Sequence, residues 1–254
     1  MATTSKVMGY LPQDTPPFGR MLLLGFQHVL TMFPATVLCA LLMHFDVSTV
    51  LTITGLGTIV ALLGSKFSIN TYIPLYYGSS FSYIAAVTSI IAVLEPDLAF
   101  GAVASPRSIS VVTAGFIVTG VLNILFGLLI RATGGKKGLD KVLPAEITGS
   151  VAIIIGIGLA YTALTMASGT CFGVEANMPP TLKWWLAAAL TFLAAVVFSV
   201  YLQGKGFIGM LPILLAMIFG YIVAIPIGLV DFSSIGSSGL ITIPKVVFPV
   251  FNNA

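Results

Sequence analysis

The residues that could bind a small molecule form two polar groups within otherwise apolar stretches. The first group is Gln27, His28 and Thr31, and the second is the run YYGSSF at residues 76–81. An ionisable side chain inside a membrane segment points to function by default. For His28, the alternative is a neutral imidazole that hydrogen-bonds a neighbouring helix. In that role it would support a site without touching its ligand.

The chain that positions these groups has 254 residues, of which 57% are hydrophobic and 7% charged. Soluble domains carry about 25% charged residues, so the composition indicates an all-α polytopic membrane protein. The basic residues lie between apolar segments, so no nucleic-acid partner is expected. Cys39 and Cys171 show neither a disulfide framework nor metal-ligand spacing. No nucleophilic triad or phosphate-binding glycine loop is present in the sequence, so we expect no enzyme, metal or cofactor.

Seven apolar segments are candidates for membrane spans. They cover residues 20–43, 47–65, 73–94, 108–131, 145–166, 182–202 and 207–230. If the N-terminus is cytoplasmic, eight of the 11 Lys and Arg residues lie inside and three outside. This bias favours a cytoplasmic N-terminus. Stripes of small residues in the second, fifth and seventh segments predict close helix packing.

The third segment, 73–94, has a polar and proline-containing first third. A helix from Ser80 to Leu94 would rise only about 22 Å. The hydrocarbon core is ~30 Å thick, so extended residues Ile73–Tyr77 would cover the remainder. Such a break leaves helix amides exposed at membrane depth and is typical of a transporter site. The alternative is an unbroken helix with Pro74 in its first turn, and these residues alone do not decide between the two.

Two motifs resemble those of a known family. The stretch FQHVLTMFPATVL at residues 26–38 is similar to the first-span Gln-His motif of the nucleobase–cation symporters, also called the nucleobase–ascorbate family. GSSFSYI at 78–84 resembles that family's third-span signature, and the nearest branch is that of uracil/xanthine permeases. The resemblance implies two inverted repeats of seven spans, with a core domain that moves against a gate domain. It also implies an extended strand before the third helix, which favours the broken segment.

The resemblance also implies roles for individual residues. The substrate-binding candidates are Phe81, Ala35, Ser80 and Ser79, and the supporting candidates are His28, Gln27 and Thr31. The amide and ring of Phe81 match the aromatic that meets the base, and Ala35 matches a small pocket residue. Pro34 stands where the uracil branch usually has glycine, which leaves the pocket shape and the substrate open.

The chain resembles only the first of the two repeats. The resemblance implies that the carboxylates that bind nucleobase and proton lie in the second repeat, and no Asp or Glu here falls at mid-membrane depth. A fragment of a longer permease is favoured over an inverted pair of copies, because the charge bias opposes dual topology. We expect a cytoplasmic tail at 1–19, a four-span core-domain part at 20–135, a three-span gate-domain part at 136–230 and an extracytoplasmic connector at 231–254.

The expected function is proton-coupled symport of a nucleobase, uracil being favoured and xanthine second, in the inner membrane. The expected partners are the nucleobase, the lipid bilayer and the missing second repeat, and the resemblance leaves a homodimer of the full permease open. Two alternatives remain. One is an anion carrier of the same architecture, of the sulfate or bicarbonate type, and the other is a membrane subunit that transports nothing.

Overall fold

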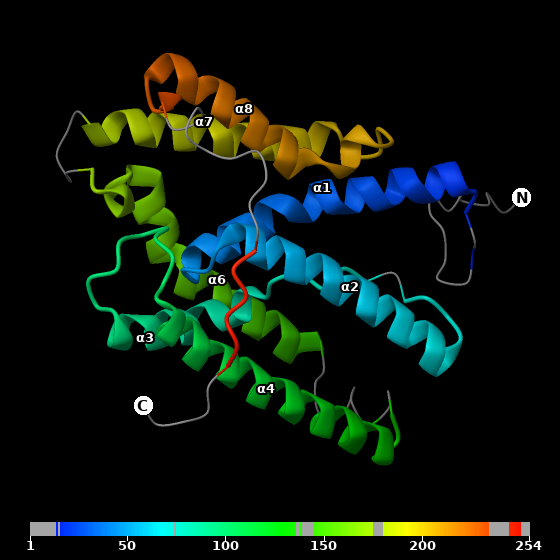
Figure 1. Cartoon of the computed structure of the whole chain (residues 1–254). Helices are drawn as coiled ribbons and strands as arrows, with labels where there is room; N and C mark the ends of the chain where they lie inside the picture. Colours follow the sequence, from blue (N-terminus) through cyan, green and yellow to red (C-terminus); the bar gives the residue numbers. More distant parts are fainter. Residues whose placement is uncertain are drawn as a thin grey trace, which may run out of the picture. The chain divides into compact units, whose positions relative to one another are not determined.

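The computed structural model describes residues 14, 16–73, 75–135, 138, 145–174, 180–233 and 244–249. Among these residues the regular structure is entirely helical (Figure 1). The α-helices are α1 (Phe18–Leu42), α2 (Val47–Ile69), α3 (Ile84–Leu94), α4 (Pro106–Ala132), α6 (Ala145–Ser168), α7 (Pro180–Tyr201) and α8 (Pro212–Ile227). The short 3₁₀ helices are η1 (Phe81–Tyr83), η2 (Thr170–Phe172) and η3 (Ile208–Met210).

Each of the seven predicted segments overlaps one of these α-helices. Helices α1, α2, α4, α6 and α7 are long and apolar enough to cross a membrane, whereas Phe81–Leu94 and Pro212–Ile227 are shorter apolar helices. Large hydrophobic side chains are exposed along them, as expected where lipid or further protein covers a surface. The chain is therefore a multi-pass membrane protein, and the all-α polytopic class is confirmed.

The third segment is broken. Residues 71–73 and 75–80 form no helix, and this stretch is called the arm below. Its last residue, Ser80, has extended backbone angles of φ −101° and ψ 123°. Helical structure then begins at Phe81 and runs through η1 and α3 to Leu94. The predicted helix start near Ser80 and end at Leu94 are confirmed, whereas Pro74 lies outside the described residues.

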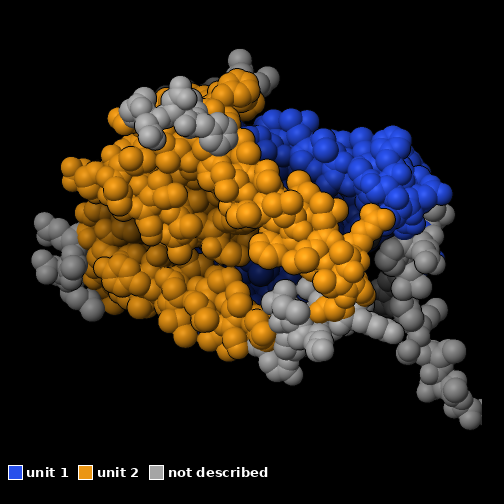
Figure 2. All heavy atoms as spheres, turned by 90° about the horizontal axis from the view of Figure 1, so that it is seen from below, with its two compact units in different colours: residues 1–38, 47–79, 189–242 blue, residues 39–46, 80–188, 243–254 orange. Residues whose placement is uncertain are grey.

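The chain divides into two compact units, coloured separately in Figure 2. Unit 1 comprises residues 1–38, 47–79 and 189–242, and unit 2 comprises 39–46, 80–188 and 243–254. The division into core-domain and gate-domain parts at residue 135 stays a prediction.

In unit 1, α8 packs against α7 through its small residues. Gly220 is buried on α8, and a Cβ there would fall against the hydroxyl of Thr191 on α7. The Phe198 and Phe219 rings meet edge to face at 6.4 Å. The predicted packing stripe is thus observed on α8. On α2, by contrast, a Cβ at Gly57 or Gly64 would meet no other described atom within 4 Å.

In unit 2, α3 packs one apolar face against α4. The buried residues Ile84, Val87 and Ile91 recur at spacings of three and four, which places them on one side of the helix. The buried residues that α4 contributes include Ile109 and Val112. This packing fixes the axis of α3, and therefore the direction in which its first turn points.

Candidate functional site

The polar residues of α1 hydrogen-bond within unit 1. The Thr31 hydroxyl donates to the carbonyl oxygen of Gln27 at 2.9 Å, one helical turn earlier. The Gln27 amide nitrogen donates to the Met210 sulfur of η3. Helix α1 continues through Pro34, which has no amide to donate to the carbonyl of Leu30. The Thr31 hydroxyl is therefore bonded within α1, whereas the Gln27 side chain links α1 to η3.

His28 meets the arm through Tyr76. Their ring centroids lie 5.8 Å apart, with an angle of 58° between the ring planes. The Tyr76 hydroxyl lies 3.5 Å from the hydroxyl of Thr36, which is buried. Because the Thr36 hydroxyl donates its proton to the Met32 carbonyl at 3.0 Å, the Tyr76 hydroxyl is the donor of this longer contact. Two residues of α1 thus hold one aromatic side chain of the arm.

Gly78 is required by the way in which the Tyr76 ring folds back over the arm. A Cβ at position 78 would lie 2.5 and 2.9 Å from two carbons of that ring and 3.8 Å from the Thr36 hydroxyl oxygen. Any larger residue would therefore displace the ring from its place beside His28. The glycine of the motif keeps the arm and α1 in contact.

The amides of the arm are bonded to two hydroxyls of α2. The Tyr77 amide donates to the Thr58 hydroxyl oxygen at 3.1 Å, and the Ile73 amide donates to that of Ser65 at 3.3 Å. Neither acceptor was predicted from the sequence as part of the site, and Thr36 was not predicted either. A usable signal was present, because Thr58 and Ser65 stand seven residues apart on one face of an apolar helix.

Ser80 and Phe81 lie in unit 2, where the helix begins. The Ser80 and Ser82 hydroxyl oxygens are 2.9 Å apart, and the Tyr83 amide donates to the Ser80 carbonyl at 3.2 Å. The first amides of a helix have no acceptor within it, so the Phe81 amide stands at the positive end of the dipole. The Tyr83 ring packs edge-on against Phe116 at 5.5 Å, which anchors this first turn.

Comparison with known proteins identifies the family. The sequence model Xan_ur_permease, described as the Permease family, matches residues 19–253. The chain belongs to this permease family. The resemblance carried by the motifs of α1 and the arm is thereby confirmed.

Curated relatives of this permease chain include proteins named for uracil. The chain is 32% identical to the uracil permease of Bacillus caldolyticus over 93% of its own length and 49% of that protein. It is 30% identical to the uracil permease of Escherichia coli strain K12, over 94% of its own length and 50% of that protein. The putative pyrimidine permease RutG of the same organism is 25% identical over 99% of the chain. The chain spans about half the length of the curated relatives it matches.

The candidate residues of this permease chain fall in both units. Gln27, His28, Thr31, Ala35 and Ser79 belong to unit 1, whereas Ser80 and Phe81 belong to unit 2. Ala35, Ser79 and Phe81 are half-buried, and His28 and Ser80 are exposed. The roles assigned to these residues by resemblance stay predictions. Within the described parts of the chain, no three His, Cys, Asp or Glu side chains are grouped as a metal site requires.

Proposed function

We propose that this chain is the N-terminal repeat of a nucleobase permease that takes up uracil, with xanthine as the second candidate, by proton symport. The observation that carries the proposal is where the family's two motifs lie. One lies on α1 around His28, and the other runs from the arm into the helix that begins at Phe81. Relatives named uracil permease support the choice of substrate. The proposal is a transporter in the inner membrane, with a cytoplasmic N-terminus, rather than an enzyme.

The proposed binding chemistry follows from uracil itself, a planar ring with carbonyl oxygens at its edge. The Phe81 amide, at the positive end of a helix, donates to one of these oxygens. The Phe81 ring stacks on the base, and Ser79 and Ser80 supply further hydrogen-bonding groups. The short side chain of Ala35 leaves room for the base. His28, with Gln27 and Thr31 beside it, supports the arm through Tyr76.

Proton coupling requires a group that binds and releases a proton in step with the substrate. The chain has eight Asp and Glu residues, and one of these, Glu146, belongs to a described helix, as the second residue of α6. A carboxylate at mid-membrane depth would therefore come from a second repeat. The chain matches about half the length of each uracil permease, which supports the proposal that a second repeat supplies this carboxylate. Alternating access in such folds also needs two repeats around a shared site.

The test is uptake of radiolabelled uracil by proteoliposomes that contain the full permease, with and without an inward proton gradient. We expect gradient-dependent accumulation, reduced by unlabelled uracil and less so by xanthine. Uptake of no purine or pyrimidine base would overturn the proposal. Uptake of sulfate or bicarbonate that nucleobases do not compete away would replace it with an anion carrier.

The same assay, with the 254-residue chain as the sole protein, tests whether one repeat alone can transport uracil. We expect no gradient-driven uracil accumulation, because one repeat supplies neither the proton-binding carboxylate nor a partner for alternating access. Robust accumulation by this chain alone would contradict the proposal that a second repeat is required. Tagged versions of each terminus, probed from both sides of the membrane, test the cytoplasmic N-terminus.

A further inference from the structure

We infer that Thr58 and Ser65 of α2 are positioning residues that set the register of the arm and thereby the affinity of the site. Neither residue belongs to the motifs that carry the family resemblance. The effect on affinity rests on the proposed function, whereas the effect on the arm's structure does not.

The two acceptors and the two donors are matched in separation. Thr58 and Ser65 are seven residues apart, which is about 10.5 Å along a helix. Ile73 and Tyr77 are four residues apart, which is about 13 Å in extended backbone. The Leu75 amide donates to the Ile73 carbonyl at 2.8 Å, so the arm is shorter here than fully extended backbone. Since Thr58 pairs with Tyr77 and Ser65 with Ile73, the arm runs antiparallel to α2 at this spacing.

Each hydroxyl is held in an orientation that leaves it only the acceptor role. The Thr58 hydroxyl donates to the Thr54 carbonyl at 2.8 Å, and the Ser65 hydroxyl donates to the Leu62 carbonyl at 2.8 Å. The one proton of each hydroxyl is therefore used within α2, and a lone pair faces the arm. Non-helical backbone in a membrane protein is tolerated where neighbouring groups, Ser and Thr side chains among them, satisfy its amides. Thr58 and Ser65 do this for the arm.

Of the two hydrogen bonds, the one from the Tyr77 amide to the Thr58 hydroxyl should affect the binding site more, because Tyr77 lies nearer to the candidate residues. Tyr77 is flanked by Tyr76, which meets His28 and Thr36, and by Gly78, which makes room for the Tyr76 ring. It precedes the candidate residue Ser79 by two positions. Losing the acceptor would leave the Tyr77 amide unsatisfied and free this part of the arm to shift. Any shift there is transmitted along the backbone to Ser79.

The first experiment measures hydrogen–deuterium exchange of arm peptides covering residues 71–80, in the full permease and in the 254-residue chain in nanodiscs. Thr58→Val keeps the shape of the side chain and removes the acceptor, so the amide of Tyr77 should exchange about threefold to tenfold faster. Thr58→Ser restores the hydroxyl and should exchange as the unmodified protein does. Ser65→Ala should accelerate exchange at the Ile73 end.

Thr52→Val is the matched control. The Thr52 hydroxyl makes the same bond within α2, to the Ser48 carbonyl at 2.8 Å. Thr52 lies six residues before Thr58, about 240° round the helix, so its loss should leave exchange of the arm unchanged. Equal exchange in Thr58→Val and Thr52→Val would overturn the inference. If Thr58→Val does not reach the membrane, Ser65→Ala decides the question at the Ile73 end of the arm, where exchange equal to that of Thr52→Val would overturn the inference.

The second experiment measures uracil uptake kinetics for the same variants. Thr58→Val should raise the apparent KM about threefold to tenfold with little change in kcat, since the arm is displaced rather than destroyed. Thr58→Ser and Thr52→Val should retain the unmodified KM. An unmodified protein that takes up no nucleobase would contradict the proposed function and leave the exchange result standing. Normal KM in Thr58→Val, in a permease that transports uracil, would overturn the positioning role.

Discussion

Helices α3 and α8 face the same physical problem, because neither is long enough to cross a membrane core of ~30 Å. With η1, the first runs from Phe81 to Leu94, and α8 runs from Pro212 to Ile227. At about 1.5 Å per residue they span roughly 21 and 24 Å. Each is preceded by backbone that is not α-helical. The two regions differ in which groups bond that backbone.

On both flanks of α3, side-chain oxygens accept hydrogen bonds from backbone amides. Before the helix, hydroxyls of α2 accept from arm amides. After it, the carboxylate of Glu95 accepts from the Ser105 amide at 3.0 Å and from the Ser105 hydroxyl at 2.7 Å. Ser105 is also the N-cap of α4, where its side chain accepts from the Ser108 amide. Side chains outside the bonded segments therefore take part on both flanks of α3, those of α2 within unit 1 and those of Glu95 and Ser105 within unit 2.

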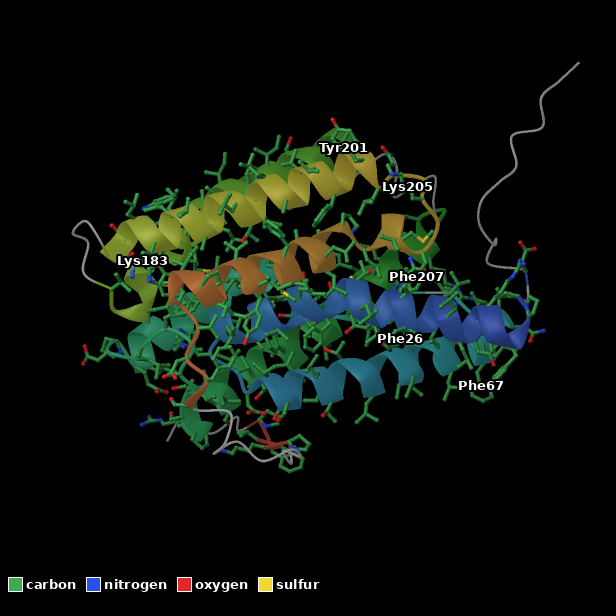
Figure 3. All side chains as sticks on the ribbon, turned by 90° about the horizontal axis from the view of Figure 1, so that it is seen from above. Phe26, Phe67, Lys183, Tyr201, Lys205 and Phe207 are labelled. Atoms are coloured by element: carbon green, nitrogen blue, oxygen red, sulfur yellow. The ribbon has the colours of Figure 1, made fainter. Side chains whose placement is uncertain are left out.

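The turns that flank α8 are closed by backbone hydrogen bonds, although side chains also take part nearby, with Gln27 donating to the Met210 sulfur before the helix and Asp231 accepting from the Ser233 amide after it. The segment before it follows Tyr201 and carries Lys205 and Phe207 (Figure 3). It is closed by local bonds, such as that from the Lys205 amide to the Leu202 carbonyl at 3.0 Å. At the other end Gly228 has φ +79°, and its amide donates to the Ile225 carbonyl at 3.0 Å. This left-handed glycine cap needs no side-chain partner.

The difference implies that α8 is sensitive to its own glycines, whereas the region of α3 is sensitive to single side chains elsewhere. The conformation of a backbone turn is determined by the residues of the turn itself. A hydrogen bond from a side chain elsewhere can be removed by a substitution that leaves the amino-acid sequence of the bonded segment unchanged. The arm can therefore be adjusted by substitutions outside the motif.

The largest expected effect is a loss of stability in the turn before α8, which backbone hydrogen bonds close. In Gly209→Ala the new Cβ would overlap the carbonyl oxygen of Leu202, a backbone atom that cannot move without opening the turn. Overpacking of this kind costs typically about 1–3 kcal/mol, so the melting temperature in detergent should fall. Gly120→Ala is the control, because a Cβ there meets nothing within 4 Å among the described residues. Equal melting temperatures for the two variants would show that the turn is not rigid.

The next effect compares two half-buried phenylalanines that precede short helices, Phe81 and Phe207. Stacking on a planar base is worth roughly 0.5–1.5 kcal/mol beyond area burial. Phe81→Ala in the full permease should therefore weaken uracil affinity about tenfold or more. Phe207→Ala should leave uracil affinity within about twofold, because the turn that carries Phe207 is closed by backbone hydrogen bonds and Phe207 lies outside the candidate site. Isothermal titration with uracil measures both, and an unchanged affinity in Phe81→Ala would mean that the ring only packs the core.

Much of this contrast could be predicted from sequence, and the missing part has a physical cause. The glycine and serines in an apolar run left two interpretations open, a broken and an unbroken third segment, and the family resemblance favoured the broken one that the structure shows. The bonds that hold the arm join residues 19 apart for Thr58 and Tyr77, and 40 apart for Thr36 and Tyr76. The seven-residue spacing of Thr58 and Ser65 marks a polar face of α2, but nothing in the local pattern identifies the arm as its partner. The roles of Phe81 and Ala35 came from resemblance rather than from their surroundings, and they stay predictions.

A smaller effect is expected at Gly78. In Gly78→Ala the new Cβ would strike the Tyr76 ring, a side chain that can rotate away, so stability should change less than in Gly209→Ala. The displaced ring would lose its contacts with His28 and Thr36, and uracil affinity should fall about twofold to fivefold.

A double-mutant cycle separates the ring from other causes at this position. In a Tyr76→Ala background there is no ring to displace, so adding Gly78→Ala should weaken uracil affinity little further. Additive losses in the cycle would contradict the proposed coupling between Gly78 and Tyr76.

The smallest expected effect is a pH dependence of the melting temperature, which we expect from Glu95 at the C-terminal end of α3. Hydrogen bonds from the Ser108 hydroxyl and from the hydroxyl and amide of Ser105 lower the pKa of Glu95 below its ordinary value of 4.5. A lowered folded-state pKa stabilises the fold above pH 4.5, and this stabilisation is lost as pH falls through the folded-state value. The Gly228 cap itself has no titratable group, and Asp231 beyond it, whose pKa is lowered by hydrogen bonds from the Ser233 amide and hydroxyl, is present in both proteins that are compared. Between pH 7 and pH 3.5 the melting temperature of the unmodified protein should therefore approach that of Glu95→Gln from above. Asp97→Asn removes a carboxylate from the same loop and should leave the pH-dependent gap in place. A gap between the unmodified protein and Glu95→Gln that stays constant down to pH 3.5 would show that Glu95 does not hold this end of α3.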